Sequence, residues 1–151
     1  MDIRQQFSVF MVNKPGILAQ VLNEIADAKI NIMALTMMDS VEHGVMRIVS
    51  KQDEKLEEVL RKLNMQYSKS EVLCVTLSNH SGAVADVTEI LAREHINISY
   101  AYCTAGAKGG KTTGVLKVAD VKKAIKVLQK KGGKKVSKDT KGVRRSPASR
   151  R

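Results

Sequence analysis

Aromatic residues are scarce in this chain, and several signals of special chemistry are missing with them. The 151 residues include no Trp and only 3% aromatic residues, so the core must be built from Ile, Leu, Val, Ala and Met. The two cysteines, Cys74 and Cys103, form no Cys-x-x-Cys pair, and with three scattered histidines they give no metal-ligand spacing. The sequence therefore predicts a protein of a reducing compartment that holds no metal and no cofactor.

Long apolar runs are also missing. The chain begins Met-Asp-Ile-Arg-Gln-Gln, without the apolar segment of a secretory signal peptide. No apolar run approaches the roughly 18 residues that a membrane-spanning helix needs. We therefore expect a soluble cytoplasmic protein with no membrane partner.

Positive charge is concentrated at one end. Residues 132–151 contain eight Lys or Arg and one acid, Asp139, and so carry +7 of the net charge of +11. Such a segment buries too little apolar surface to offset the entropy of ordering, and it is predicted to be a flexible tail. Within it, Lys135–Ser137 could complete a sheet, and the tail could contact nucleic acid or an acidic partner.

Two halves of the chain align when Asn13 is placed on Asn79. Segment 13–32 reads NKPGILAQVLNEIADAKINI, and segment 79–98 reads NHSGAVADVTEILAREHINI. Gly16 then meets Gly82, and the Ile-Asn-Ile runs at 30–32 and 96–98 coincide. The chain therefore contains a duplicated module of about 65 residues.

Each repeat predicts the same order of elements: strand, helix, strand, strand, helix, strand. The strands are short runs rich in strand-forming residues, and the helices have apolar residues three and four apart. Asp53 and Asp120 are predicted to cap the second helix of each repeat. The predicted ranges are 7–12, 17–25, 31–38, 45–50, 53–63 and 65–71, then 72–78, 84–91, 97–103, 115–119 and 121–128.

This order predicts an α+β fold of two tandem ferredoxin-like βαββαβ modules, each an antiparallel sheet with both helices on one face. We divide the chain into a first module at residues 1–70, a second module at 71–131 and the basic tail at 132–151. One module of this size buries only a marginal core. The bare face or edge of its sheet therefore predicts that the modules pack together and that the protein forms a homodimer.

The turn between the first strand and the first helix is the candidate binding site. Asn13 is placed to cap the helix or to order the turn, Pro15 suits a helix entry because its missing amide hydrogen has no helical partner there, and Gly16 lets the backbone approach a ligand. The free amides of Gly16, Ile17 and Leu18, with the positive end of the helix dipole, suit a carboxylate. The alternative is that the turn only starts a helix.

Asn31 opens the strand that follows this helix. In a βαβ half of this fold, the start of that strand lies near the far end of the helix, away from the turn. The turn and Asn31 can therefore contact one ligand only across an interface between modules. The alternative is a polar corner at the start of a strand.

The segment FSVFMVNKPGIL at 7–18, followed by Ile-Asn-Ile at 30–32, resembles the ACT domain, the regulatory module of enzymes such as phosphoglycerate dehydrogenase and aspartate kinase. Residues 5–131 resemble stand-alone tandem ACT proteins, which carry no enzyme domain. The resemblance implies an effector, usually an amino acid, held between modules by the turn on one side and by the strand-opening Asn on the other. The ligand-binding residues that it implies are Asn13, Gly16, Ile17, Leu18, Asn31, Asn79, Gly82, Ala83, Val84 and Asn97.

The chain departs from the family pattern at both turns. Serine-binding members have a His two positions before the first Asn, where this chain has Met11 and Leu77. The second turn has Ser81 in place of Pro. Serine is therefore not the expected effector, and the two sites need not be equal.

A Gly-rich segment at 105–112, AGAKGGKT, matches the loose pattern of a phosphate-binding loop. That loop binds phosphate only between a strand and a helix. The repeat places the segment between two strands, so we interpret it as a hairpin loop.

No nucleophile–base pair and no carboxylate pair would be brought together by this fold, so no catalytic residue is predicted. The sequence favours a regulatory sensor that binds an amino acid and has no catalytic activity. The alternative is a nucleic-acid-associated regulator whose tail, 132–151, binds phosphates. Because the tail lacks the interleaved aromatic residues of a stacking surface, a solubilising or partner-docking role also stays open.

Overall fold

The computed structural model describes residues 1–38, 43–78, 80–104 and 111–132. Its elements follow the predicted order of strands and helices. In chain order they are β1 (Asp2–Val12), α1 (Ile17–Asp27), β2 (Ile32–Met38), β3 (His43–Ser50), α2 (Asp53–Lys62), β4 (Gln66–Leu77), α3 (Ala83–Arg93), β5 (Ile98–Cys103), β6 (Thr112–Val118) and α4 (Val121–Gly132).

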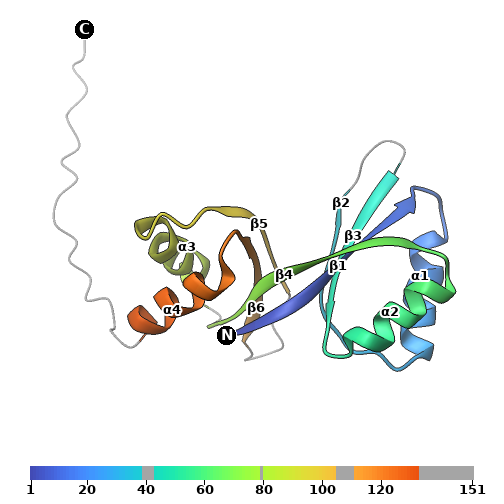
Figure 1. Cartoon of the computed structure of the whole chain (residues 1–151), viewed down its shortest axis with the longest axis horizontal. Helices are drawn as coiled ribbons and strands as arrows, with labels where there is room; N and C mark the ends of the chain where they lie inside the picture. Colours follow the sequence, from blue (N-terminus) through green and yellow to red (C-terminus); the bar gives the residue numbers. More distant parts are fainter. Residues whose placement is uncertain (39–42, 79, 105–110, 133–151) are drawn as a thin grey trace, which may run out of the picture.

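The strands form one antiparallel sheet of six strands in the order β2-β3-β1-β4-β6-β5. The two central strands, β1 and β4, are also the longest, with 11 and 12 residues. Figure 1 shows them running from the helix pair α1 and α2 to the helix pair α3 and α4. The sheet is curled, and the predicted α+β arrangement of tandem ferredoxin-like modules is confirmed.

Each helix pair packs on the sheet through its own apolar core. Val21 and Ile25 lie four residues apart on α1 and are both buried, as the periodicity predicts. They pack on alternate residues of β1: Phe7, Val9 and Met11. The second helix pair packs in the same way on alternate residues of β4: Leu73, Val75 and Leu77. Burial of each such side chain stabilises the fold by about 1.5–3 kcal/mol.

The two modules share β4. Its residues Gln66–Cys74 pair with β1, and Leu73–Leu77 pair with β6. The closing strand of the first module and the opening strand of the second are therefore one continuous strand. The module boundary predicted at 70/71 falls inside it.

β1 is shared as well, because it begins at Asp2, well before the predicted start at position 7. Asp2–Gln5 pair with Glu71–Cys74, on the opposite edge of β4 from β6. They occupy the place beside β4 that a closing strand of the second module would take. Lys135–Ser137, which the sequence suggests for that place, lie outside the described residues.

The helix-free faces of the two modules pack against each other. A small apolar core joins them, formed by Ala34, Val49, Val72, Cys74 and Val115. Gln6 is also fully buried: its Nε2 donates a hydrogen bond to Tyr100 Oη at 2.7 Å, and its Oε1 accepts one from the Tyr102 hydroxyl at 3.0 Å. The Arg47 guanidinium carbon lies 3.6 Å from the centroid of the Tyr100 ring. These contacts tie β1 and β3 of the first module to β5 of the second.

One of the two predicted helix caps is wrong. Asp120 caps α4, since its Oδ1 accepts a hydrogen bond from the Lys123 amide at 2.8 Å. Asp53 is instead the first residue of α2, and Gln52 is the N-cap. The turn before α2 is held by Ser50, whose hydroxyl accepts a hydrogen bond from the Gln52 amide at 3.1 Å.

Candidate functional site

The turn between β1 and α1 forms the first candidate site. After β1 ends, the Lys14 amide donates a hydrogen bond to the Val12 carbonyl at 2.9 Å. Gly16 is the N-cap of α1 and has a φ of 90°, a left-handed conformation that favours glycine. A Cβ placed on Gly16 would meet no atom within 4 Å. The space at the start of α1 is therefore open to a ligand.

One of the two roles predicted for Asn13 differs in the structure. Asn13 is not the N-cap of α1, which has Gly16 there and no side-chain cap. Pro15 lies at the entry to the helix, directly before this N-cap, and Ile17 is the first helical residue.

The turn between β4 and α3 repeats this geometry. The His80 amide donates to the Ser78 carbonyl at 2.9 Å, as in the first turn. Gly82 is the N-cap with a φ of 95°, and a Cβ placed on it would also meet no atom within 4 Å. The two turns thus share the left-handed N-cap glycine and the hydrogen bond before it, although Ser81 replaces Pro. Asn79 lies outside the described residues.

At each helix start, the first and second backbone amides differ in whether they already have a hydrogen-bond acceptor. The Ile17 amide donates to the Lys14 carbonyl at 3.4 Å, and Ala83 makes the equivalent bond at 3.3 Å. These bonds are long, so both amides are only weakly paired. The amides of Leu18 and Val84 lie in the first helical turn, where no intrahelical acceptor is available. They are the better placed donors for a ligand.

The helix starts also differ in charge. α1 has no acidic residue in its first turn, so the positive end of its dipole is not compensated. α3 has Asp86 there, and its carboxylate would repel a negatively charged ligand group. A carboxylate is therefore favoured at the first site over the second. The position of Asp86 just after the turn is the sequence signal for this difference between the two sites.

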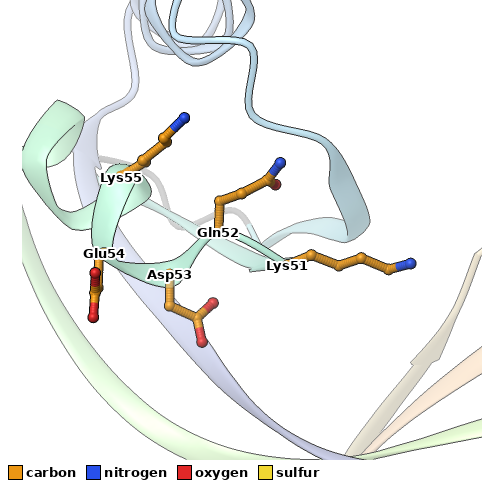
Figure 2. Close-up of a pocket in the computed structure, with 5 residues that line it drawn as sticks. All are labelled: Lys51, Gln52, Asp53, Glu54 and Lys55. Carbon is orange, nitrogen blue, oxygen red and sulfur yellow. The ribbon is translucent and has the colours of Figure 1, made fainter.

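The start of α2 offers a contrasting hollow. It measures about 390 Å³ and is lined by Lys51, Gln52, Asp53, Glu54 and Lys55 (Figure 2). The side chains of Gln52 and Lys55 extend to one side of the ribbon and those of Asp53 and Glu54 to the other, without converging on one point (Figure 2). With two carboxylates in the first turn, this helix start is a poor site for an anion.

An apolar hollow adjoins the start of α1. It measures about 370 Å³ and is lined by Phe10, Met11, Val12, Ile17, His43, Asn64, Met65 and Gln66. The hollow beside α3 measures about 630 Å³, and its lining includes the polar residues Thr76, Ser78, His80 and Asp86. No sequence pattern groups the residues that line either hollow, because they come from elements far apart in the chain.

Asn31 and Asn97 lie at the ends of the strands away from the turns. In the first module, the turn and Asn31 lie at opposite ends of β3. Val12, just before the turn, pairs with His43 at the start of β3, and Ile32, just after Asn31, pairs with Ser50 at its end. The length of β3 between these pairs is roughly 24 Å. The second module has a similar separation, roughly 20 Å, along β6. The Asn31 amide donates instead to Gln52 Oε1 at 3.2 Å.

The Gly-rich segment is followed by a strand. Residues 105–110 lie outside the described part of the chain, but β5 before them and β6 after them are antiparallel neighbours. In the described part, no group of three or more His, Cys, Asp or Glu side chains could hold a metal ion. No helix of that part is long and apolar enough to cross a bilayer.

Comparisons with known proteins give several related structures and no match among curated sequences. A protein of Bacteroides thetaiotaomicron is 27% identical, with a TM-score of 0.78, covering 86% of this chain and 89% of that chain. The regulatory subunit of aspartate kinase from Thermus thermophilus is 16% identical, with a TM-score of 0.59, covering 86% and 93%. The subunit from Thermus flavus is also 16% identical, with a TM-score of 0.55, covering 86% and 92%. The two Thermus proteins show a shared fold.

A family model described as the ACT domain pair matches residues 1–140. The match includes all six strands and all four helices of the described residues, so it rests on the whole duplicated fold and not on one motif. It confirms the resemblance seen in the two turns. This chain belongs to the ACT domain pair family.

Proposed function

We propose that this protein is a regulatory sensor that binds an amino acid as its effector and has no catalytic activity of its own. The observation that carries this proposal is the matched pair of turns, each with a left-handed glycine, open space and first-turn amides. Membership of the ACT domain pair family supports a regulatory, ligand-binding role. The shared fold with regulatory subunits of aspartate kinase points the same way.

In this proposal the effector's carboxylate binds at the start of α1. The Leu18 amide and the uncompensated dipole favour negative charge there. The effector's side chain occupies the adjoining hollow beside Met11, Ile17 and Met65, which favours an apolar amino acid. The equivalent site at Gly82, Ala83 and Val84 is weaker because Asp86 lies in the same helical turn.

A second copy of the chain completes each site. The strand-opening Asn31 and Asn97 cannot reach the turns of their own modules, because a whole strand separates them. In a homodimer, the turn of one copy faces a strand-opening Asn of the other. That side chain would offer an amide oxygen as the acceptor for the ligand's ammonium group.

The proposal predicts that one amino acid raises the melting temperature of the protein. A ligand at 100 times its Kd adds about 2.7 kcal/mol to the free energy of unfolding. Melting curves against the twenty amino acids, followed by sedimentation with the best one, test both binding and dimerisation. If no amino acid shifts the melting temperature at millimolar concentration, the sensor proposal fails.

Asn31→Ala should weaken binding ten- to a hundredfold, because it leaves a buried ligand group without its acceptor, at about 1–3 kcal/mol. Its melting temperature without ligand should change little, since Asn31 is exposed. Asn23→Ala, an exposed Asn on α1, is the matched control and should bind normally. Normal binding by Asn31→Ala would remove Asn31 from the site while leaving the turn in place.

Moving the negative charge of Asp86 to the equivalent position in α1 should reverse which of the two sites binds the effector more tightly. Gln20 and Asp86 are equivalent, since each amide donates to the N-cap glycine carbonyl at 2.9 Å. Asp86→Asn should strengthen the second site, and Gln20→Asp should weaken the first, each by about 1 kcal/mol or roughly fivefold. Isothermal titration with the identified effector measures both sites. Unchanged affinities in both variants would show that the carboxylate does not bind at the helix starts.

A further inference from the structure

The positive charge of the chain begins at α4. Residues 121–151 contain 13 of the 26 Lys and Arg residues and one of the 15 acidic residues, Asp139. Residues 1–120 consequently carry a net charge of −1, and residues 121–151 carry +12. The charge therefore lies not only in the segment after the folded domains but also on a helix of the second module.

The solvent face of α4 is a row of lysines. Lys122, Lys126 and Lys130 are exposed and follow one another at intervals of four residues, with a rise of about 6 Å between neighbours. None of the three forms an ion pair with another described residue. Lys123 is exposed too, and its ammonium group donates to the Glu94 carbonyl at 3.3 Å.

This charge pattern opposes the stability of the helix. Lys122 and Lys123 lie in the first turn, where the positive end of the dipole disfavours cations. Like charges four residues apart repel by about 0.2–0.5 kcal/mol per pair. In α2 the order is favourable, with acids in the first turn and Arg61 and Lys62 in the last. The charges of α4 are therefore unfavourable for the helix, whereas those of α2 are favourable. Such a local conflict is expected where a surface has a binding role.

We propose that the lysine face of α4 binds the phosphate backbone of a nucleic acid. The apolar residues of α4, Val121, Ala124 and Leu128, are buried in the second core, so α4 has no apolar face to place in a bilayer. A regular row of point charges suits a regularly repeating line of phosphates better than an irregular acidic protein surface. Residues 121–151 contain no aromatic residue, so contacts with phosphate predominate and binding is not sequence-specific.

The test uses the full chain and a labelled 20-base-pair DNA duplex, with fluorescence anisotropy measured from low to physiological salt. The logarithm of the binding constant should fall linearly with the logarithm of the salt concentration. The triple variant Lys122→Gln, Lys126→Gln and Lys130→Gln should reduce the steepness of that slope by about 3. The control triple variant Lys29→Gln, Lys51→Gln and Lys55→Gln removes the same charge from the first module and should keep the slope.

Circular-dichroism melts should show both triple variants folded, since all six lysines are exposed. Absence of duplex binding, or an unchanged slope in the α4 variant, would overturn the proposal. So would equal or tighter binding of poly-glutamate or phosphatidylserine vesicles that is lost in the same variant, because an acidic protein or a membrane would then be the partner. The outcome is independent of amino-acid binding at the turns.

Discussion

Deleting residues 2–5 should lower the free energy of unfolding by roughly 4 kcal/mol, because about four main-chain hydrogen bonds to β4 contribute about 1 kcal/mol each. These residues pair with Glu71–Cys74 and close the sheet of the second module. A loss of this size is a large part of the roughly 5–15 kcal/mol by which a domain is typically stable. The first module keeps β2, β3, β4 and most of β1, so the damage should fall on the second.

Hydrogen exchange followed by mass spectrometry can locate that damage. Exchange should rise along Leu73–Leu77, β6 and α4, and change less in α1 and α2. Removing residues 133–151 is the matched control and should leave melting unchanged, because Asp2–Gln5 already occupy the edge of β4 beside Glu71–Cys74. If the C-terminal deletion is the more damaging of the two, then Lys135–Ser137 form a necessary strand and the start of β1 does not close the second module.

Gln6→Leu should destabilise the protein by about 2–4 kcal/mol. The variant removes the hydrogen bonds that join Gln6 to the Tyr100 and Tyr102 hydroxyls, and each part-buried polar group left unpaired costs about 1–3 kcal/mol. Burial raises the pKa of the Tyr102 hydroxyl well above its ordinary value. Urea unfolding curves measure the change.

A multiple-mutant cycle separates lost hydrogen bonds from altered packing. Adding Tyr100→Phe and Tyr102→Phe to Gln6→Leu removes the unpaired hydroxyls and should recover most of the lost stability, since apolar groups then meet apolar groups. Gln20→Leu, an exposed Gln on α1, is the control and should change stability little. If the triple variant is less stable than Gln6→Leu alone, packing and not hydrogen bonding holds the two modules together here.

Local patterns are enough to predict the order of the elements. Each helix has its own apolar stripe, such as Val21 and Ile25 on α1, and most strands have their own apolar run. The start of β1 has neither, because Asp-Ile-Arg-Gln-Gln is mostly polar. Its strand conformation depends on β4, which comes much later in the chain. Gln6 likewise is a residue type that usually lies on the surface. It is buried here because Tyr100 and Tyr102 of β5 pack over it and form hydrogen bonds with it.

The candidate site is predictable from sequence only in outline. The repeat identifies both turns, because Asn, Gly and Ile-Asn-Ile recur in register. It does not fix the backbone, since a glycine at position 16 fits both an ordinary helix start and the left-handed N-cap that is observed. The hollow beside α1 has no sequence signal, because β1, α1, β3 and the connection from α2 into β4 each contribute only one to three of its residues.

The shared strand β1 has a consequence for the newly made chain. Asp2 pairs with Cys74, so the whole first module is synthesised between the two partners. At roughly 5–20 residues per second, the start of β1 waits about 4–14 s for its partner. An unpaired strand edge is a template for pairing with other chains, and charged side chains such as those of Asp2 and Arg4 discourage it. We therefore expect the polar composition of this strand, which is also why it has no apolar strand pattern, to reduce pairing with other chains during synthesis.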